Sequence, residues 1–210
     1  MNLIRTSPYI SGALVVAGTW VLGISVHRFP LLAFTGIVLS AAGIVLKAGS
    51  VGELLTISGL SSWNKKSIIY SIPGILTGLA LAFFYSQAYG TNFLPATLMI
   101  QAIIAPLIGI TEELIFRGYI QGIFKGFDGW FGILAGAGSH AVYKLLVIGS
   151  YPEEIGASLI YLFLFTLVAG ILFGWMRKLA GNLLPAALAH AVFDLVIYGG
   201  LATLPGWVWY

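Results

Sequence analysis

The sequence predicts an all-α polytopic membrane protein, folded as one helical bundle with about seven transmembrane spans. Of the 210 residues, 59% are hydrophobic and only 8% are charged, whereas a soluble domain carries roughly 25% charged residues. Long apolar runs recur along the whole chain, and a helix that crosses about 30 Å of hydrocarbon needs around 20 mostly apolar residues. These observations favour a single membrane bundle over a chain with a second, soluble domain.

The apolar runs divide into about seven predicted spans. The segment from Val51 to Trp63 is too polar to cross and is predicted to form a short interfacial helix. The fourth span would measure about 42 Å as a straight helix, so it must tilt, kink or protrude, and Pro106 marks the expected kink. The predicted spans are Ile10 to Val26, Leu31 to Leu46, Ile68 to Phe84, Leu94 to Gln121, Trp130 to Ile148, Ile155 to Trp175 and Leu183 to Leu201.

The basic residues indicate how this bundle is oriented. The amino terminus and the loops after the second, fourth and sixth spans share one side of the membrane. The basic residues on that side are Arg5, Lys47, Lys65, Lys66, Lys125, Arg177 and Lys178. The opposite side carries Arg28 together with Glu153 and Glu154. The positive-inside rule therefore predicts a cell-membrane protein with its amino terminus in the cytoplasm and its carboxyl terminus outside.

Composition also excludes several kinds of chemistry and partner. The chain contains no cysteine, which removes disulfides, thiolate metal sites and cysteine nucleophiles. The net charge of +3 is small and its basic residues are scattered, so nucleic acid is not an expected partner. The membrane lipid is the partner that composition does predict.

Ionisable side chains within the predicted spans are the candidates for function. Such a residue costs several kcal/mol at membrane depth and marks a functional site by default. At about 1.5 Å of helix rise per residue, Glu112, His140 and His190 all lie about 12–15 Å below the predicted cytoplasmic face. Three helices therefore bring polar chemistry to one level. The full set is Glu112, Glu113, Arg117, His140, Lys144, His190 and Asp194.

The stretch TEELIFRGYIQG, residues 111–122, separates its two glutamates by helical geometry. Glu113 and Arg117 are four residues apart, so they share a face and are predicted to form an ion pair. Glu112 is rotated by about 100° and has no such partner within its own helix. One glutamate is thus predicted to be structural and the other chemical. The alternative is a buried clamp in which both glutamates share the arginine.

The histidines by themselves carry less information. His140 alone is typical of a hydrogen-bonded helix-packing residue. In GNLLPAALAHAVFD, residues 181–194, Asn182 and Pro185 supply ordinary helix-start chemistry. His190 and Asp194 then share a face at a four-residue spacing. The pair could take part in catalysis, or the aspartate could simply orient the imidazole.

The ordered set Glu-Glu-x-x-x-Arg on one span, His on the next and His-x-x-x-Asp on a later span resembles the CAAX-protease and bacteriocin-processing family of intramembrane proteases. That family includes the type II CAAX prenyl endopeptidases and the bacterial Abi proteins. The resemblance covers roughly Leu98 to Tyr198. It divides the chain into amino-terminal spans (1–92), a CAAX-protease-like catalytic core (93–201) and an aromatic carboxyl-terminal tail (202–210).

The resemblance implies an endopeptidase that cuts a membrane-anchored or lipidated peptide, such as a prenylated CAAX-type substrate, near the cytoplasmic face. It implies that Glu112 and His140 hold and activate the attacking water. His190 and the residue at 194 would stabilise the oxyanion of the tetrahedral intermediate. The supporting residues would be Glu113 and Arg117.

Two positions depart from the family pattern. The second motif usually reads Phe-x-x-x-His, whereas Gly136 stands four residues before His140, so helix packing near the site is expected to be looser or closer than usual. Asp194 stands where the prenyl endopeptidases generally have asparagine, and an ionised carboxylate repels an oxyanion. Lys144 lies one turn from His140, so we expect it either to pair with Asp194 and cancel its charge or to snorkel outward.

Three other functions compete with this one. A zinc protease would use Glu112, His140 and His190 as ligands, since two histidines, a carboxylate and water form a recognised zinc shell, and Glu113 would then be the remaining base. A transport or proton-relay protein also uses buried ionisable residues, although no inverted repeat supports it. A catalytically idle immunity or scaffold protein would be consistent with the changes at Gly136 and Asp194.

Overall fold

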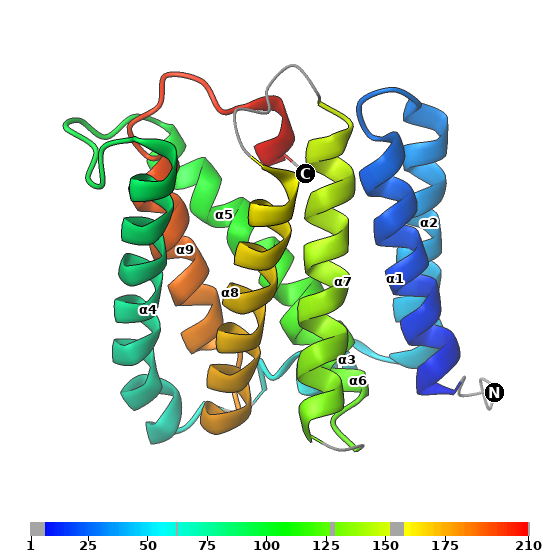
Figure 1. Ribbon diagram of the computed structural model, residues 1–210. Coiled ribbons are helices and arrows are strands. Elements are labelled where there is room, and N and C mark those ends of the chain that lie inside the picture. The colour runs from blue at the N-terminus through cyan, green and yellow to red at the C-terminus, as the bar shows by residue number, and fades with distance from the viewer. Residues whose placement is uncertain (1–6, 62, 127–128, 152–157, 210) are drawn as a thin grey trace.

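The computed structural model describes the chain except for residues 1–6, 62, 127–128, 152–157 and 210. Within the described ranges the regular structure is helical and contains no β-strand, which confirms the predicted all-α class. The long helices lie side by side and run between the two ends of the molecule (Figure 1). Arg5, Glu153, Glu154 and the predicted start of the sixth span lie outside the described residues.

Five helices in the described part of the chain are long and apolar enough to cross a membrane. They are α1 (Pro8–Ser25), α2 (Pro30–Lys47), α4 (Lys65–Tyr89), α7 (Gly129–Gly149) and α8 (Leu159–Ala180). Helix α9 (Leu184–Tyr198) is apolar but shorter, and the remaining predicted span is interrupted. The chain is thus an integral membrane bundle, while the exact number of spans stays a prediction.

The interrupted span contains the two glutamates. It consists of α5 (Gln101–Glu113), the π-helix η1 (Leu114–Ile120) and the short α6 (Gln121–Ile123). A π-helix has hydrogen bonds from i to i+5 and usually occurs as a short insert, frequently at a functional site. Pro106 lies inside α5, whereas the change of helix type lies on the other side of the glutamates.

The predicted start of this span at Leu94 is wrong, because α5 begins at Gln101. Pro95 lacks a backbone N–H for a helix, and the N–H of Met99 donates to the carbonyl of Gly199 at 2.8 Å. The chain before α5 is therefore bound to the chain after α9 instead of being coiled into a helix. This shorter helix also removes the excess length that a continuous span would have.

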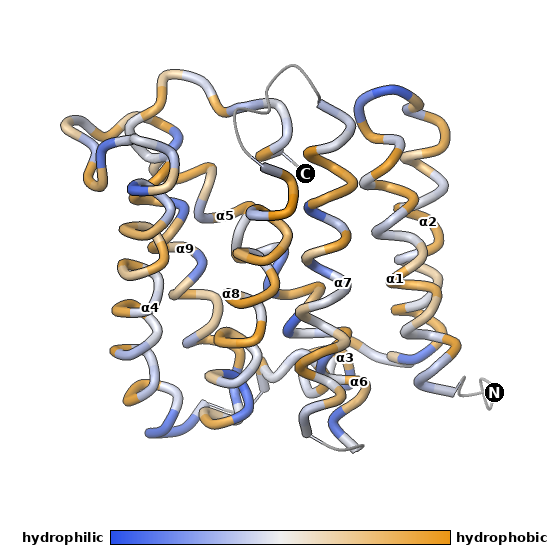
Figure 2. Tube along the Cα trace, viewed as in Figure 1, coloured by the Kyte–Doolittle hydropathy of each residue, from blue (hydrophilic) through white to orange (hydrophobic). Residues whose placement is uncertain are grey.

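Basic residues gather at one end of the bundle. Figure 1 places the start of α1, helix α3 (Val51–Ser58) and the turn between α8 and α9 at this end, and the α1–α2 turn at the other. The same ends of α4 and α8 are hydrophilic (Figure 2). The basic residues of these helix ends are Lys47, Lys65, Lys66, Arg177 and Lys178. Their placement agrees with the predicted alternation of spans, whereas the side of the membrane stays a prediction.

Arg177 is buried at this end and joins three elements. Its Nη2 donates to the carbonyl of Ile57 at 2.7 Å and to that of Gly118 at 3.1 Å. These bonds connect α8 to the end of α3 and to the π-helix. Helix α3 occupies the first part of the predicted interfacial segment and ends before Gly59, which has a φ of 76°. Through Arg177 it is connected to the π-helix.

One buried hydrophobic cluster holds α4 and α9 together with α5 and α8. It includes Tyr85 of α4, Phe193 of α9 and Val208 of the predicted tail. Helices α4 and α9 approach closely because residue 74 is glycine: a Cβ at Gly74 would lie 2.6 Å from the carbonyl oxygen of Pro185. Both the last amino-terminal helix and the tail therefore contribute to the core that surrounds the site.

Candidate active site

Glu112 and Glu113 are the last two residues of α5, directly before the π-helix. Both side chains are buried, with 5% of Glu112 and 0% of Glu113 exposed. A carboxylate in such a place must be paired or hydrogen-bonded to be stable. The partners of the two glutamates therefore define the candidate site.

Glu113 and Arg117 form the predicted ion pair, with Nη1 of the arginine 2.8 Å from Oε1 of the glutamate. The same glutamate oxygen accepts a hydrogen bond from Nδ1 of His190 at 2.9 Å. Nη1 of Arg117 also lies 2.7 Å from Nδ1 of His140. Glu113 and Arg117 thus connect the histidines of α7 and α9.

Glu112 lies between α7 and α9 and contacts residues of both helices. Its Oε2 is 3.0 Å from Nε2 of His140 and 3.8 Å from Nε2 of His190. Its Oε1 forms an ion pair with Nζ of Lys144. The three helices that were predicted to bring polar residues to one level therefore meet at Glu112.

The expected pairing of Lys144 with Asp194 is wrong for this structure. In the described part of the chain Lys144 is paired with Glu112, and the ion pair of Asp194 is with His190, at 3.7 Å between Oδ2 and Nε2. Because Glu112 lies between α7 and α9, the lysine of α7 reaches that carboxylate first. The prediction that Glu112 has no ion-pair partner within its own helix agrees with the structure, in which the partners of Glu112 come from other helices.

The hydrogen bonds of His140 determine where its ring proton lies. A guanidinium can only donate, so Nδ1 of His140 accepts the bond from Arg117. The proton is then on Nε2, which donates to Oε2 of Glu112. Phe116 stacks on the ring, with the centroids 4.5 Å apart. His140 is thus held as a donor that orients Glu112.

His190 turns its second nitrogen toward the acidic residues. Since Nδ1 donates to Glu113, Nε2 is the atom that faces Glu112 and Asp194. Helix α5 passes close by because residue 109 is glycine: a Cβ at Gly109 would meet Oδ2 of Asp194 and lie 2.9 Å from Cδ2 of His190. The sequence analysis missed Gly109, although its position one turn before Glu113 is a usable signal.

Residues 91–196 match the family model described as type II CAAX prenyl endopeptidase Rce1-like. The chain belongs to the Rce1-like family. This is a family of CAAX-type intramembrane proteases, so the resemblance seen in the sequence is confirmed, and the match contains every charged residue of the site. No curated protein and no solved structure gave a match.

The glycine in the second motif of this Rce1-like chain makes helix packing closer. A Cβ at Gly136 would lie 2.6 Å from the carbonyl oxygen of Phe116. Helix α7 therefore packs directly on the backbone of the π-helix, and a phenylalanine at 136 would not fit. Of the two expected alternatives, looser or closer packing, the structure shows the closer one.

The Rce1-like site does not fit zinc at its predicted ligands. Zinc binds a nitrogen lone pair, but Nε2 of His140 carries the proton and the lone pair of Nδ1 is used by Arg117. The opposite tautomer would place an N–H against a guanidinium donor. The arrangement therefore holds Glu112 by hydrogen bonds and does not offer His140 as a ligand beside Glu112 and His190.

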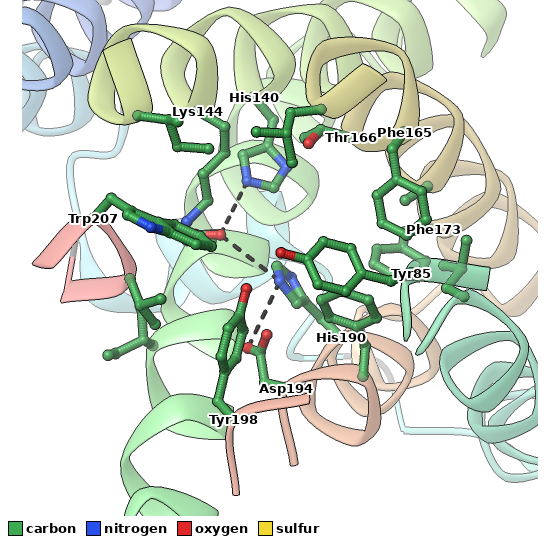
Figure 3. Close-up of a pocket in the computed structure, with 18 of the residues that line it drawn as sticks. Tyr85, His140, Lys144, Phe165, Thr166, Phe173, His190, Asp194, Tyr198 and Trp207 are labelled. Carbon is green, nitrogen blue, oxygen red and sulfur yellow. Dashed lines mark hydrogen bonds and ion pairs between the residues drawn. The ribbon is translucent and has the colours of Figure 1, made fainter. Parts of the chain in front are cut away.

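A pocket that opens to the outside lies beside the charged residues. Its walls come from α4, α5, the π-helix η1, α7, α8, α9 and the carboxyl-terminal 3-10 helix η3 (Gly206–Trp209). A mostly apolar cavity with a few convergent polar groups is typical of a ligand site. Figure 3 shows several of its aromatic side chains around the histidines: Tyr85, Phe165, Phe173, Tyr198 and Trp207.

Two tyrosines of this Rce1-like pocket were missed in the sequence, Tyr85 and Tyr198. Tyr198 lies four residues after Asp194 and therefore on the same face of α9, which is a signal that the sequence contains. Tyr85 comes from α4, and no local pattern around it points to the site. Both tyrosines lie outside the residues that match the family model.

Proposed function

We propose that this Rce1-like protein is an intramembrane endopeptidase in which Glu112 activates the water that attacks the peptide bond. The observation that carries the proposal is the placement of Glu112, which is held by His140 and Lys144 and lines the pocket opposite His190. A general base must be oriented and within reach of the reacting group. The carboxylate is oriented, and it lines an open pocket in which a peptide bond could reach it.

The proposed reaction needs only water and the peptide. Glu112 takes a proton from the water while its oxygen attacks the carbonyl carbon, and the carbonyl oxygen becomes an oxyanion. The tetrahedral intermediate then collapses, the bond from carbon to nitrogen breaks, and the leaving nitrogen takes the proton from Glu112. The products are a carboxylic acid and an amine.

His140 and Lys144 have positioning roles in this proposal. Each holds one oxygen of Glu112, His140 by a hydrogen bond and Lys144 by its charge. Because Nε2 of His140 is a donor to Glu112, this ring orients the base instead of taking the proton of the water itself. The ammonium of Lys144 compensates a carboxylate that would otherwise be unpaired at depth.

His190 is proposed as a donor to the oxyanion. Its Nδ1–H is used by Glu113, so a donation from Nε2 requires a second proton on the ring. With that proton, three negative and three positive charges balance in the cluster. The negative groups are Glu112, Glu113 and Asp194, and the positive groups are Arg117, Lys144 and His190.

The proposed substrate is a membrane-anchored or lipidated peptide, such as a prenylated CAAX-type peptide. The charged wall of the pocket would act on the peptide bond, and the aromatic wall suits an apolar chain beside it. The surrounding membrane lipid would hold such a substrate near the bundle. No step of this proposal passes through a metal ion.

The proposed orientation has the basic end of the bundle in the cytoplasm, with the carboxyl terminus outside. The chain contains no cysteine, so single cysteines report sidedness without interference. A Ser61→Cys variant at the basic end should react with a membrane-impermeant maleimide only after the cells are opened. An Asn92→Cys variant, at the opposite end, should react in intact cells. The reverse pattern would contradict the orientation.

The activity is tested with purified protein in liposomes and matched peptides with and without a prenyl group. We expect the wild type to cleave the prenylated peptide and Glu112→Gln to lose cleavage, because an amide cannot take the proton from water. Glu53→Gln, a change on α3 away from the pocket, is the control and should cleave like the wild type. Unchanged cleavage by Glu112→Gln would sink the proposal.

A further inference from the structure

Helix α9 presents a stripe of polar residues to the pocket. His190, Asp194 and Tyr198 follow one another at four-residue intervals, all three line the pocket, and all are buried. Tyr85 of α4 lines the pocket from the facing side. The polar side of the pocket therefore includes two tyrosine hydroxyl groups in addition to the acidic residues and histidines of the Rce1-like motifs.

The two phenols lie on the same side of the pocket. Tyr85 and Tyr198 both line it, one from α4 and one from α9. Figure 3 shows both hydroxyl groups turned toward the middle of the pocket, beside His190 and Asp194. Each phenol has one hydrogen to donate. Each hydroxyl group can therefore donate to an acceptor that enters the pocket.

Aromatic neighbours hold the two rings in place. Tyr85 meets Phe193 and Phe165 edge to face, at 5.5 Å and 5.6 Å between ring centroids. Tyr198 meets Trp207 edge to face at 6.0 Å. Donors that are fixed before the reaction need no rearrangement when charge develops, and this makes them effective in a site from which water is excluded.

Asp194 cannot supply such a donor when it is ionised, because a carboxylate only accepts hydrogen bonds. It lines the same pocket as both phenols. The donor that the oxyanion needs beside His190 must therefore come from another side chain. Tyr85 and Tyr198 are the neutral donors at that place in the pocket.

We propose that the Tyr85–Tyr198 pair donates a hydrogen bond to the carbonyl oxygen of the scissile peptide bond and to the oxyanion that this oxygen becomes. No bond to the tyrosines forms or breaks, and the phenol keeps its proton. The inference rests on the proposed peptidase function. It adds to the family motifs two catalytic residues from outside the matched residues 91–196.

The test compares three tyrosine-to-phenylalanine changes in the liposome assay. Tyr198→Phe and Tyr85→Phe should each lower kcat by about 10- to 100-fold while KM stays near the wild-type value, since the donor acts on developing charge. Tyr89→Phe is the matched control, because its buried hydroxyl has no hydrogen-bond partner among the described residues and does not line the pocket. It should retain the wild-type kcat.

A rescue experiment separates the donor role from a structural one. Asp194→Asn places an N–H donor beside the same oxyanion, so the Asp194→Asn/Tyr198→Phe double variant should recover part of the kcat that Tyr198→Phe loses. Thermal unfolding of the three single tyrosine-to-phenylalanine variants in detergent should stay at the wild-type midpoint. A loss of kcat that follows a lower midpoint, or that appears equally in Tyr89→Phe, would overturn the inference.

Binding of a transition-state mimic tests the tyrosines without turnover. The hydrate of a peptide aldehyde resembles the tetrahedral intermediate, whereas the matching peptide alcohol does not. Tyr198→Phe should weaken binding of the aldehyde and leave binding of the alcohol unchanged, and equal affinities for the aldehyde in both proteins would refute the inference. A Glu112→Gln protein that cleaves normally contradicts the proposed function instead, so the two failures are distinguishable.

Discussion

Lys144 and His140 bind the two oxygens of one carboxylate, Glu112, from consecutive turns of α7. His140 donates to Oε2 at 3.0 Å and Lys144 pairs with Oε1. Because both oxygens are held from one helix face, the carboxyl plane cannot rotate without losing a partner. The orientation of the proposed base thus depends on the four-residue spacing of two α7 residues.

Removal of the lysine should destabilise the bundle. Lys144→Met leaves the buried carboxylate of Glu112 without its cation, and breaking a buried pair in this way costs about 3 kcal/mol. Glu112→Gln/Lys144→Met removes both charges and should regain most of that loss. The free energy of unfolding, measured in detergent with a denaturant, gives these values. Lys66→Met, at an exposed position, should stay within about 0.5 kcal/mol of the wild type.

The same measurement decides which carboxylate Lys144 contacts. Lys144→Met and Glu112→Gln should be strongly non-additive, because the two side chains touch. Lys144→Met and Asp194→Asn should be close to additive. Strong coupling with Asp194 and none with Glu112 would show that the pairing in the structure is not the one that the protein uses.

Removal of divalent metal should leave the peptidase activity unchanged. His140 donates from Nε2 to Glu112 while Nδ1 accepts from Arg117, so its ring has no lone pair left for a metal ion. We expect the rate in liposomes to stay the same after treatment with a chelator. Metal analysis of the purified protein should find less than stoichiometric zinc. A rate that falls on chelation and returns with added zinc would contradict this prediction.

The parts of the site that the sequence predicted are those set by helix geometry. Glu113 and Arg117 could be paired in advance because residues four apart on a helix are neighbours. Glu112, His140 and His190 could be placed at one depth because the rise per residue is fixed. Both arguments need only the positions of the residues within their own helices.

The parts that could not be predicted depend on how the helices pack. The partner of Lys144 is decided by the position of Glu112 between α7 and α9, which no spacing within one helix reveals. Met99 leaves the helical state because it bonds to Gly199, a residue far away in the chain. Tyr85 reaches the pocket because α4 packs on α9. Each of these outcomes is a contact between distant segments.

Restoring the usual phenylalanine of the family motif at position 136 should damage this protein. A Cβ at Gly136 already lies 2.6 Å from the carbonyl oxygen of Phe116, and a backbone atom cannot move aside as a side chain can. Gly136→Ala should therefore destabilise the bundle by about 1–3 kcal/mol, the usual cost of overpacking. Gly136→Phe should cost more and displace His140 from Glu112, so cleavage should be lost.

Gly138 provides the matched control on the same helix. A Cβ at Gly138 meets no atom within 4 Å, so Gly138→Ala should be neutral or stabilise the protein by about 0.5–1 kcal/mol, since alanine is the better helix former. The midpoint of thermal unfolding in detergent and the rate of peptide cleavage measure both positions. If Gly136→Ala were as stable and active as Gly138→Ala, close packing of α7 on the π-helix would not explain why residue 136 is glycine.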